Sequence, residues 1–360
     1  IDADDIWYAK KLEKQIKFMK ENKYDFSFTS YFKKTSNKKS IPVQSKKYKI
    51  LYKDLLFDNE IGLSTVILNK KIIKGELFPS LKTKEDYVAW LKLSYNNESH
   101  KFYNGVGRYG TCTGALIETN GNDSSPAYIL TNGHCLGKLL PEEGVLFDKF
   151  IENKLMLFNT FYDSTGEQFS YSTQKIKYAT MDKNDIAIIE LEGVTLGTLK
   201  QLGFNAYEIS QEEPLAGILI ENVGIPATGL SSSEKVLRKS VCTLNGTVNV
   251  QEGVYNFATS YKHNCSIVGG SSGSPIFNRQ THEIIAVNNT TVNDSAGNQE
   301  DCSINKPCEI IDQSIKTNVF SNYAQPVWFL SSCFTDEGVF DRLLESCSLK
   351  DLVSLNDGEF

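Results

Sequence analysis

The sequence has 360 residues, of which 40% are hydrophobic and 23% charged, and its net charge is −6. At roughly 100–200 residues per domain, this length predicts two domains, or one large domain with an extension. The composition excludes collagen and low-complexity disorder, and eight cysteines are too few for a small disulfide scaffold. No apolar run approaches the ~20 residues that a membrane-spanning helix needs, so we expect no membrane span. The sequence begins at Ile1 without an apolar leader, so we expect any secretion signal to have been removed or to lie outside it.

The charge is unevenly distributed along the chain. Residues 1–101 contain 21 lysines, no arginine and 13 acidic residues, which gives a charge of +8, whereas the remainder carries −14. A basic segment joined to an acidic body predicts an intramolecular contact between the two, or a separate anionic partner for the segment. The simpler alternative is a lysine-rich solvated surface. We expect no nucleic acid as partner and no membrane span.

Residues 1–100 are predicted to form a basic N-terminal extension or pro-segment of mixed, partly helical structure. Apolar residues recur at helical spacing between Asp4 and Lys23, which predicts an amphipathic helix, and a second helix is expected at 85–93. The lysine-rich stretch 33–49 between them reads as an exposed loop. The apolar content of the segment is thin for an independent core, so a pro-segment and a permanent accessory layer both remain open.

From Tyr103 onward the pattern changes to short β-type runs separated by Gly, Asn, Asp and Ser. Such spacing predicts an all-β sandwich or a pair of barrels. A helical pattern returns only near 339–347, where we expect a C-terminal helix. The expected strands are 112–118, 127–131, 154–161, 169–178, 185–191, 217–223, 240–250, 274–277 and 283–287.

Three short segments carry the pattern of a catalytic site. The first is Cys112-Thr113-Gly114-Ala115-Leu116-Ile117, followed by Tyr128-Ile129-Leu130-Thr131-Asn132-Gly133-His134-Cys135. The second is Asn184-Asp185-Ile186-Ala187-Ile188-Ile189-Glu190-Leu191, and the third is Gly269-Gly270-Ser271-Ser272-Gly273-Ser274-Pro275-Ile276-Phe277. Together, and in the order His, Asp, Ser, they resemble the chymotrypsin-like (trypsin-fold) serine proteases, most closely the bacterial lysyl and glutamyl endopeptidases. The resemblance covers about residues 103–330.

The resemblance implies a fold of two six-stranded antiparallel β-barrels over a protease domain at 101–360. It also implies a catalytic triad in which Ser272 is the nucleophile, His134 the general base and Asp185 the group that orients His134. The backbone N–H groups of Gly270 and Ser272 would form the oxyanion hole. Asp182 is the nearest alternative acid, and Ser271 and Ser274 are the alternative nucleophiles.

The eight cysteines lie beyond residue 101 and form no CxxC pair, which argues against a zinc site and favours disulfides made outside the cytosol. The resemblance implies a Cys112–Cys135 bridge. Pairing of the other six is not fixed by spacing, although sequence neighbours (Cys242–Cys265, Cys302–Cys308, Cys333–Cys347) are the simplest choice. We expect no metal and no organic cofactor.

The residues expected around the substrate depart from the family pattern. In the family frame the floor of the primary specificity pocket falls near Ser266, where the trypsin pattern would have Asp. Asn288 and Asn289 stand on the wall strand, where glutamyl endopeptidases carry a His. The pocket therefore reads as polar and uncharged, although Asp294, Glu300 and Asp301 just beyond could admit a basic side chain. Ser271 replaces the Asp that a new N-terminus pairs with in trypsin-like zymogens, so we expect activation, if any, to follow another route.

These observations predict a secreted or extracytoplasmic serine endopeptidase that hydrolyses a protein or peptide substrate through an acyl-enzyme. Two alternatives stay open. One is a catalytically silent binding protein on a protease scaffold. The other is an esterase-like hydrolase on the same fold.

Overall fold

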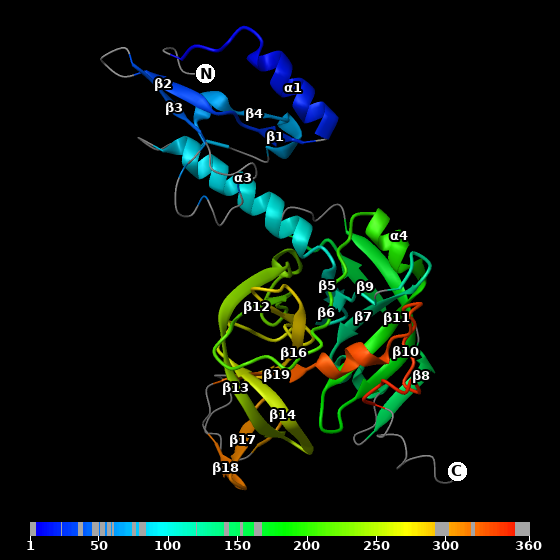
Figure 1. Ribbon diagram of the computed structural model, residues 1–360. Helices are drawn as coiled ribbons and strands as arrows, with labels where there is room; N and C mark the ends of the chain where they lie inside the picture. The colour runs from blue at the N-terminus through cyan, green and yellow to red at the C-terminus, as the bar shows by residue number, and fades with distance from the viewer. Residues whose placement is uncertain are drawn as a thin grey trace. The chain divides into compact units, whose positions relative to one another are not determined.

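The computed structural model describes residues 5–22, 24–34, 39–44, 50, 55, 59, 61–73, 77–78, 84–119, 121–139, 144–151, 154–161, 168–291, 302–317 and 321–349. For 94–101 it describes the backbone alone. The chain divides into two compact units, Ile1–Lys101 and Phe102–Phe360. Figure 1 colours both along the sequence.

The first unit contains two α-helices and two small pairs of antiparallel strands among its described residues. Strand β1 pairs with β4, and β2 pairs with β3. The elements are α1 (Lys11–Asn22), β1 (Phe26–Ser27), β2 (Tyr31–Lys34), β3 (Ser40–Val43), the 3-10 turn η1 (Leu63–Thr65), β4 (Ile67–Leu68), the 3-10 turn η2 (Lys70–Ile72) and α3 (Glu85–Phe102).

The first unit has a small hydrophobic core of its own, which corrects the expectation from its thin apolar content. Trp90 and Leu93 of α3 are buried there with Leu55 and Ile61. The helix expected from Asp4 begins only at Lys11. Ile6, ahead of it, is 83% exposed, and the Trp7 indole N–H donates to the carbonyl of Ser64 at 2.8 Å. That bond ties the residues before α1 to the segment around Ser64, and these residues do not continue the helix.

The first sheet of the second unit runs in the order β11-β7-β6-β5-β9-β10-β8. Because β10 also pairs with β11, six of these described strands close into a ring, with β8 outside it. The strands are β5 (Val106–Tyr109), β6 (Cys112–Leu116), β7 (Pro126–Thr131), β8 (Val145–Phe150), β9 (Leu155–Phe158), β10 (Phe169–Thr180) and β11 (Ile186–Thr195). The short helix α4 (Leu196–Gln201) follows β11, and a 3-10 segment, η3 (Gly133–Leu139), follows β7.

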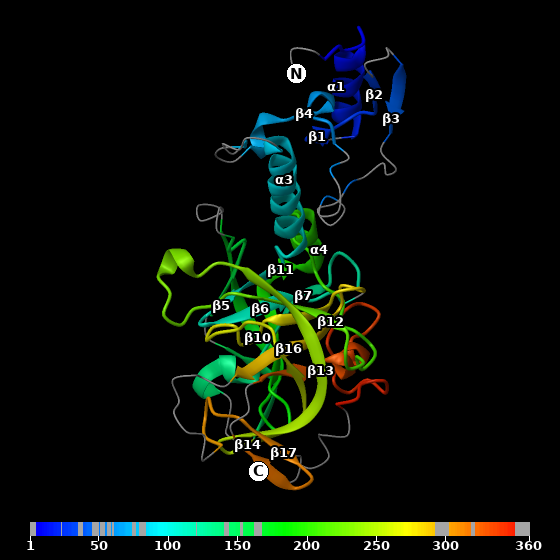
Figure 2. The ribbon, with the colours of Figure 1, turned by 90° about the vertical axis from the view of Figure 1, so that its left-hand side faces the viewer.

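The second sheet runs in the order β12-β15-β16-β19-β14-β13-β17-β18. Pairing of β12 with β13 closes another ring of six described strands, and the long, strongly curved β13 is prominent in Figure 2. The strands are β12 (Leu219–Gly224), β13 (Arg238–Glu252), β14 (Tyr255–His263), β15 (Pro275–Asn278), β16 (Ile284–Thr291), β17 (Cys308–Ile311), β18 (Ser314–Lys316) and β19 (Asn322–Pro326). The 3-10 turn η4 (Ser232–Glu234) precedes β13, and η6 (Trp328–Cys333) follows β19.

One hydrophobic cluster joins the two sheets. Ala115 and Ile188 enter it from the first sheet, and Val223 and Val287 from the second. All four side chains are fully buried or nearly so. The fold is therefore mostly β, with two closed sheets packed on a shared core and little helix. This confirms the chymotrypsin-like fold class expected from the sequence.

The C-terminal helix expected at 339–347 is not formed. The described chain makes turns there instead, because its backbone is tied to distant partners: Asp341 N donates to Cys333 O, and Thr335 N donates to Val339 O. Phe340 is buried against Tyr178 and Phe334. Across the described ranges, every helix is too short or too polar to cross a bilayer.

Candidate active site

The three predicted catalytic residues lie at strand ends of the two sheets. His134 follows β7 and Asp185 precedes β11, two strands that pair with each other in the first sheet. Ser272 precedes β15 of the second sheet. Thr113 on β6 joins the two sheets at this point, since its N–H donates to Ser272 O at 2.8 Å and its hydroxyl to Gly270 O at 3.0 Å.

His134 and Asp185 are hydrogen-bonded through both backbone and side chain. The imidazole Nδ1 lies 2.5 Å from Asp185 Oδ2, and the His134 backbone N–H donates to Oδ1 at 2.9 Å. Asp185 is fully buried, whereas about a third of the His134 side chain is exposed. Burial by itself lowers the pKa of His134, but the charge of Asp185 and its hydrogen bond outweigh burial and raise the pKa above its usual value.

Ser272 stands on a tight turn between two glycines with positive φ, Gly270 (100°) and Gly273 (76°). A Cβ at Gly270 would meet the backbone N of Ala227, and one at Gly273 would meet the carbonyl of Thr113. Only glycine fits both positions without strain. In this structure Ser272 Oγ donates to the carbonyl of Asn289 at 3.5 Å, and not to His134.

The backbone N–H groups of Gly270 and Ser272 point away from the hydrogen bonds that hold the turn. Gly269 O accepts from the N–H groups of Ala227 and Thr228 at 2.8 and 2.9 Å. Since a trans peptide directs its C=O and N–H oppositely, the Gly270 N–H faces away from these partners. Ser271 O accepts from Ser274 N and Asn288 Nδ2, so the Ser272 N–H of the same peptide group faces away from these two donors. Neither N–H donates to another described residue.

Asn132, which was not among the predicted site residues, links the three segments that carry His134, Asp185 and Ser272. Its Nδ2 donates to Asp185 O at 2.7 Å, and its Oδ1 accepts from the backbone N–H of Gly273 at 2.5 Å. The side chain is fully buried. Its position two residues before His134 was the available signal, but sequence alone gives no partner for an Asn at a strand end.

Asn288 and His263 form a second buried connection to the turn that carries Ser272. Cys265 N–H donates to His263 Nδ1 at 3.3 Å, which leaves the proton on Nε2 to be donated to Asn288 Oδ1 at 3.2 Å. Asn288 Nδ2 then donates to Ser271 O at 3.1 Å. Burial lowers the pKa of His263 to about 4, a shift opposed by its hydrogen bond with Asn288.

The predicted pocket residues lie in two separate environments. Ser266 is exposed and lines a cavity of about 300 Å³ together with Ser271, Ser240 and Asn222. Asn288 and Asn289 are buried on β16, and Asn288 has both ends of its amide bonded inside the protein. Asp294, Glu300 and Asp301 lie outside the described residues.

The eight cysteines form four disulfides, Cys112–Cys135, Cys242–Cys265, Cys302–Cys308 and Cys333–Cys347. Two His/Cys groups bring possible metal-ligand atoms within 4.8 Å, one around His134 and one around His263. Both cysteines of each group are held in a disulfide, so neither group offers a thiolate to a metal ion.

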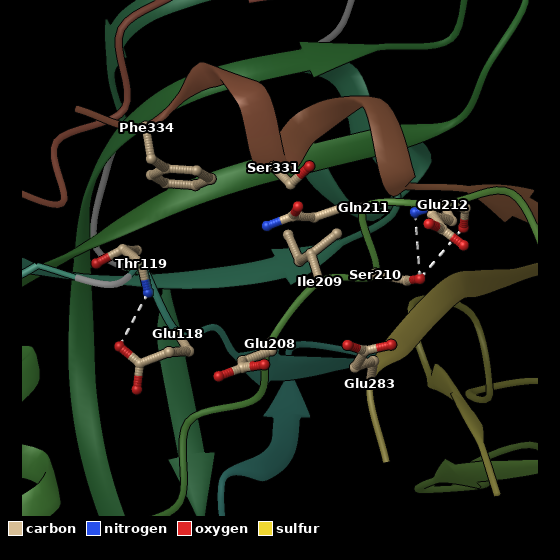
Figure 3. A pocket seen from close by; sticks show the side chains of 10 residues that line it. All are labelled: Glu118, Thr119, Glu208, Ile209, Ser210, Gln211, Glu212, Glu283, Ser331 and Phe334. Carbon is tan, nitrogen blue, oxygen red and sulfur yellow. Dashed lines mark hydrogen bonds between the residues drawn. The ribbon is translucent and has the colours of Figure 1, made fainter. Parts of the chain in front are cut away.

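A larger cavity of about 410 Å³ lies elsewhere on the second unit (Figure 3). Glu118, Glu208, Glu212 and Glu283 line it, together with Ile209 and Phe334. None of the predicted site residues lies there, so its size does not bear on the catalytic assignment.

Residues 112–287 match the family model described as trypsin-like peptidase domain. Among solved structures, the MamO protease domain of Magnetospirillum magneticum is 12% identical with a TM-score of 0.41, covering 63% of this chain and 94% of that chain. A Glu endopeptidase is 19% identical with a TM-score of 0.40, covering 62% and 85%.

A different kind of similarity involves about a quarter of the chain. The Escherichia coli UDP-Glc:alpha-D-GlcNAc-diphosphoundecaprenol beta-1,3-glucosyltransferase WfgD is 36% identical over 97 residues. The match covers 27% of this chain and 38% of the enzyme, so the chain spans little more than a third of that relative.

Proposed function

The chain contains a trypsin-like peptidase domain, and from this premise we propose that it is a serine endopeptidase with His134, Asp185 and Ser272 as its triad. The observation that carries the proposal is the pairing of His134 Nδ1 with Asp185. With Nδ1 bonded to Asp185, the second ring nitrogen, Nε2, is the one that accepts the Ser272 proton in this proposal.

The proposed reaction follows from these positions. Ser272 Oγ turns from the Asn289 carbonyl to His134, loses its proton to Nε2 and attacks the substrate carbonyl. The oxyanion that forms accepts from the open N–H groups of Gly270 and Ser272, while Asp185 stabilises the imidazolium. His134 then protonates the leaving amine, and water hydrolyses the acyl-enzyme with His134 again as base.

The first test is labelling with a fluorophosphonate probe, followed by mass spectrometry to locate the modified residue. We expect label on Ser272, and none in Ser272→Ala. A folded chain that takes no label would favour the silent binding scaffold instead. Parallel assays with matched peptide and ester substrates separate an endopeptidase from an esterase-like hydrolase.

An extracytoplasmic location and a peptide substrate are part of the same proposal. The chain has four disulfides. Disulfides persist in oxidising surroundings and are rare in the cytosol. The peptidase domain supports a protein or peptide as partner. A contact between the basic first unit and the acidic second unit stays a prediction.

A second candidate function concerns the first unit. Its 101 residues are close in number to the 97 that match the glucosyltransferase, and they lie outside the peptidase match. We propose that this unit is part of a glycosyltransferase-like domain that binds a nucleotide sugar. The rival interpretation is the pro-segment. Titration of the chain with UDP-glucose tests the first, and labelling of Ser272 before and after cleavage near residue 101 tests the second.

A further inference from the structure

Glu252, at the end of β13, is a buried carboxylate close to the proposed catalytic residues. It is 7% exposed. Its Oε1 accepts from the hydroxyl of Thr290 at 3.0 Å and from the backbone N–H of Asn305 at 2.7 Å. Two donors on one oxygen fix the orientation of the carboxylate, and neither donor carries a charge that would neutralise it.

The position of Thr290 places this carboxylate near the turn that carries Ser272. Thr290 follows Asn289, whose carbonyl accepts from Ser272 Oγ, and Asn288 O accepts from Gly273 N. The end of β16 therefore borders the nucleophile on one side and Glu252 on the other. The charged groups that act on Glu252 are His134 and Asp185, so the carboxylate lies within electrostatic range of the base.

Glu252 has no cationic partner within the described part of the chain. Buried glutamates elsewhere in the second sheet do have one: Glu309 pairs with Lys262 and Glu221 with Lys239. Glu252 Oε2 accepts no hydrogen bond from a described residue, and 7% of the residue is exposed to solvent. A buried carboxylate is costly unless a cation or further donors compensate it, so this free oxygen is suited to a cation supplied by a ligand.

Given the proposed endopeptidase function, we propose that Glu252 forms an acidic subsite that binds the lysine or arginine side chain of a peptide substrate. The subsite differs from the primary pocket near Ser266, because the cavity that contains Ser266 does not include Glu252 or Thr290. The cationic residue is therefore a residue of the substrate other than the one whose carbonyl is attacked.

Cleavage-site profiling with a proteome-derived peptide library tests the subsite. We expect lysine and arginine to be enriched at one position near the cut, and Glu252→Gln to reduce kcat/KM for such peptides by about 5- to 30-fold through KM. For peptides with glutamine at that position, Glu252→Gln should change kcat/KM little. Gln keeps an acceptor for Thr290 and Asn305, and Glu192→Gln, an exposed site on β11, is the control for the loss of one charge.

Two results would overturn the subsite: no enrichment of cationic residues in the wild type, or an equal loss on all peptides in Glu252→Gln. Fluorophosphonate labelling of Ser272 is run alongside, so that failure of the proposed function is recognised separately. If peptides are not cleaved, fluorescence anisotropy compares lysine and glutamine peptides on Ser272→Ala and on Glu252→Gln/Ser272→Ala. Equal affinities in the single variant would then reject the subsite.

Discussion

The side-chain amide of Asn132 donates to the backbone carbonyl of Asp185 at 2.7 Å. The same side chain accepts from Gly273 N–H, so one buried residue connects the segments that carry His134, Asp185 and Ser272. Two of those segments belong to the first sheet and the third to the second. The relative placement of these segments therefore depends in part on a buried residue that lies outside the proposed triad.

Substituting Asn132 should lower both activity and stability. Asn132→Ala removes the side-chain donor to the buried carbonyl of Asp185 and leaves the N–H of Gly273 with Asn288 O as its acceptor. Loss of the buried donor should cost about 1–3 kcal/mol of stability. We expect kcat to fall by roughly 10- to 100-fold as the turn relaxes. Urea unfolding and steady-state kinetics measure the two effects. Asn256→Ala, on the exposed face of β14, is the control, and an unchanged kcat in Asn132→Ala would reject the positioning role.

The raised pKa of His134 determines the acid limb of the pH profile. The base must be neutral to accept the Ser272 proton, so kcat/KM should fall as the pH drops through a value above the usual ~6.5 of histidine. Asp185→Asn removes the charge that raises this pKa. The limb should then move to lower pH, while kcat falls by about 10³- to 10⁴-fold because the tautomer is no longer fixed. An acid limb that stays in place would contradict this assignment.

The charge of Glu252 also raises the pKa of His134 and therefore shifts the acid limb of the pH profile to higher pH. In Glu252→Gln, the acid limb for an uncharged peptide should shift to lower pH, by less than in Asp185→Asn. The pKa of Glu252 is itself raised by burial. Preference for lysine peptides should accordingly fade on acidification, as the carboxylate becomes protonated. A pH series of kcat/KM on matched lysine and glutamine peptides measures both effects.

His263 predicts that the free energy of unfolding decreases at acid pH. Its pKa is about 4 when folded and about 6.5 when unfolded, so the unfolded chain binds the extra proton first. The contribution of neutral His263 to the free energy of unfolding is complete above pH ~6.5. It is lost as the pH falls towards 4, and the loss is on the order of 3 kcal/mol. Urea unfolding at pH 7 and 4.5 should show this loss reduced in His263→Gln. His282→Asn, at an exposed histidine, should retain it.

The Cys112–Cys135 disulfide should contribute more stability than Cys302–Cys308. The first closes a loop with a sequence separation of 23 and the second one of 6. Loop-closure entropy then predicts losses of about 3.5 and about 2.4 kcal/mol for the two double Cys→Ser variants. The first variant should also lose activity, because Cys135 adjoins His134. Equal kcat in the two variants would argue that the disulfide does not hold His134 in place.

Several features of the protein were predictable from local sequence. Short apolar runs bounded by Gly, Asn, Asp and Ser predicted most strands of both sheets, including the run before His134 and the run after Asp185. The three motifs identified the segments that the fold brings together. The strands that escaped prediction, such as β8 and β14, carry polar or aromatic residues on their exposed faces, so their alternation is weak. The turns at 339–347 looked helical because burial of Phe340 in the shared core is invisible in the sequence.

The β-rich character of the second unit, the chain order of its three motifs and the glycines around Ser272 follow from the amino-acid sequence. These are local properties, set by short apolar runs and by allowed φ values at single residues. The contacts of Asn132, His263 and Glu252 follow from the folded chain. Their partners are far away along the chain, on strands whose closure into two rings brings buried polar groups together. Each such group must find a partner when it leaves water, and that requirement is met in three dimensions.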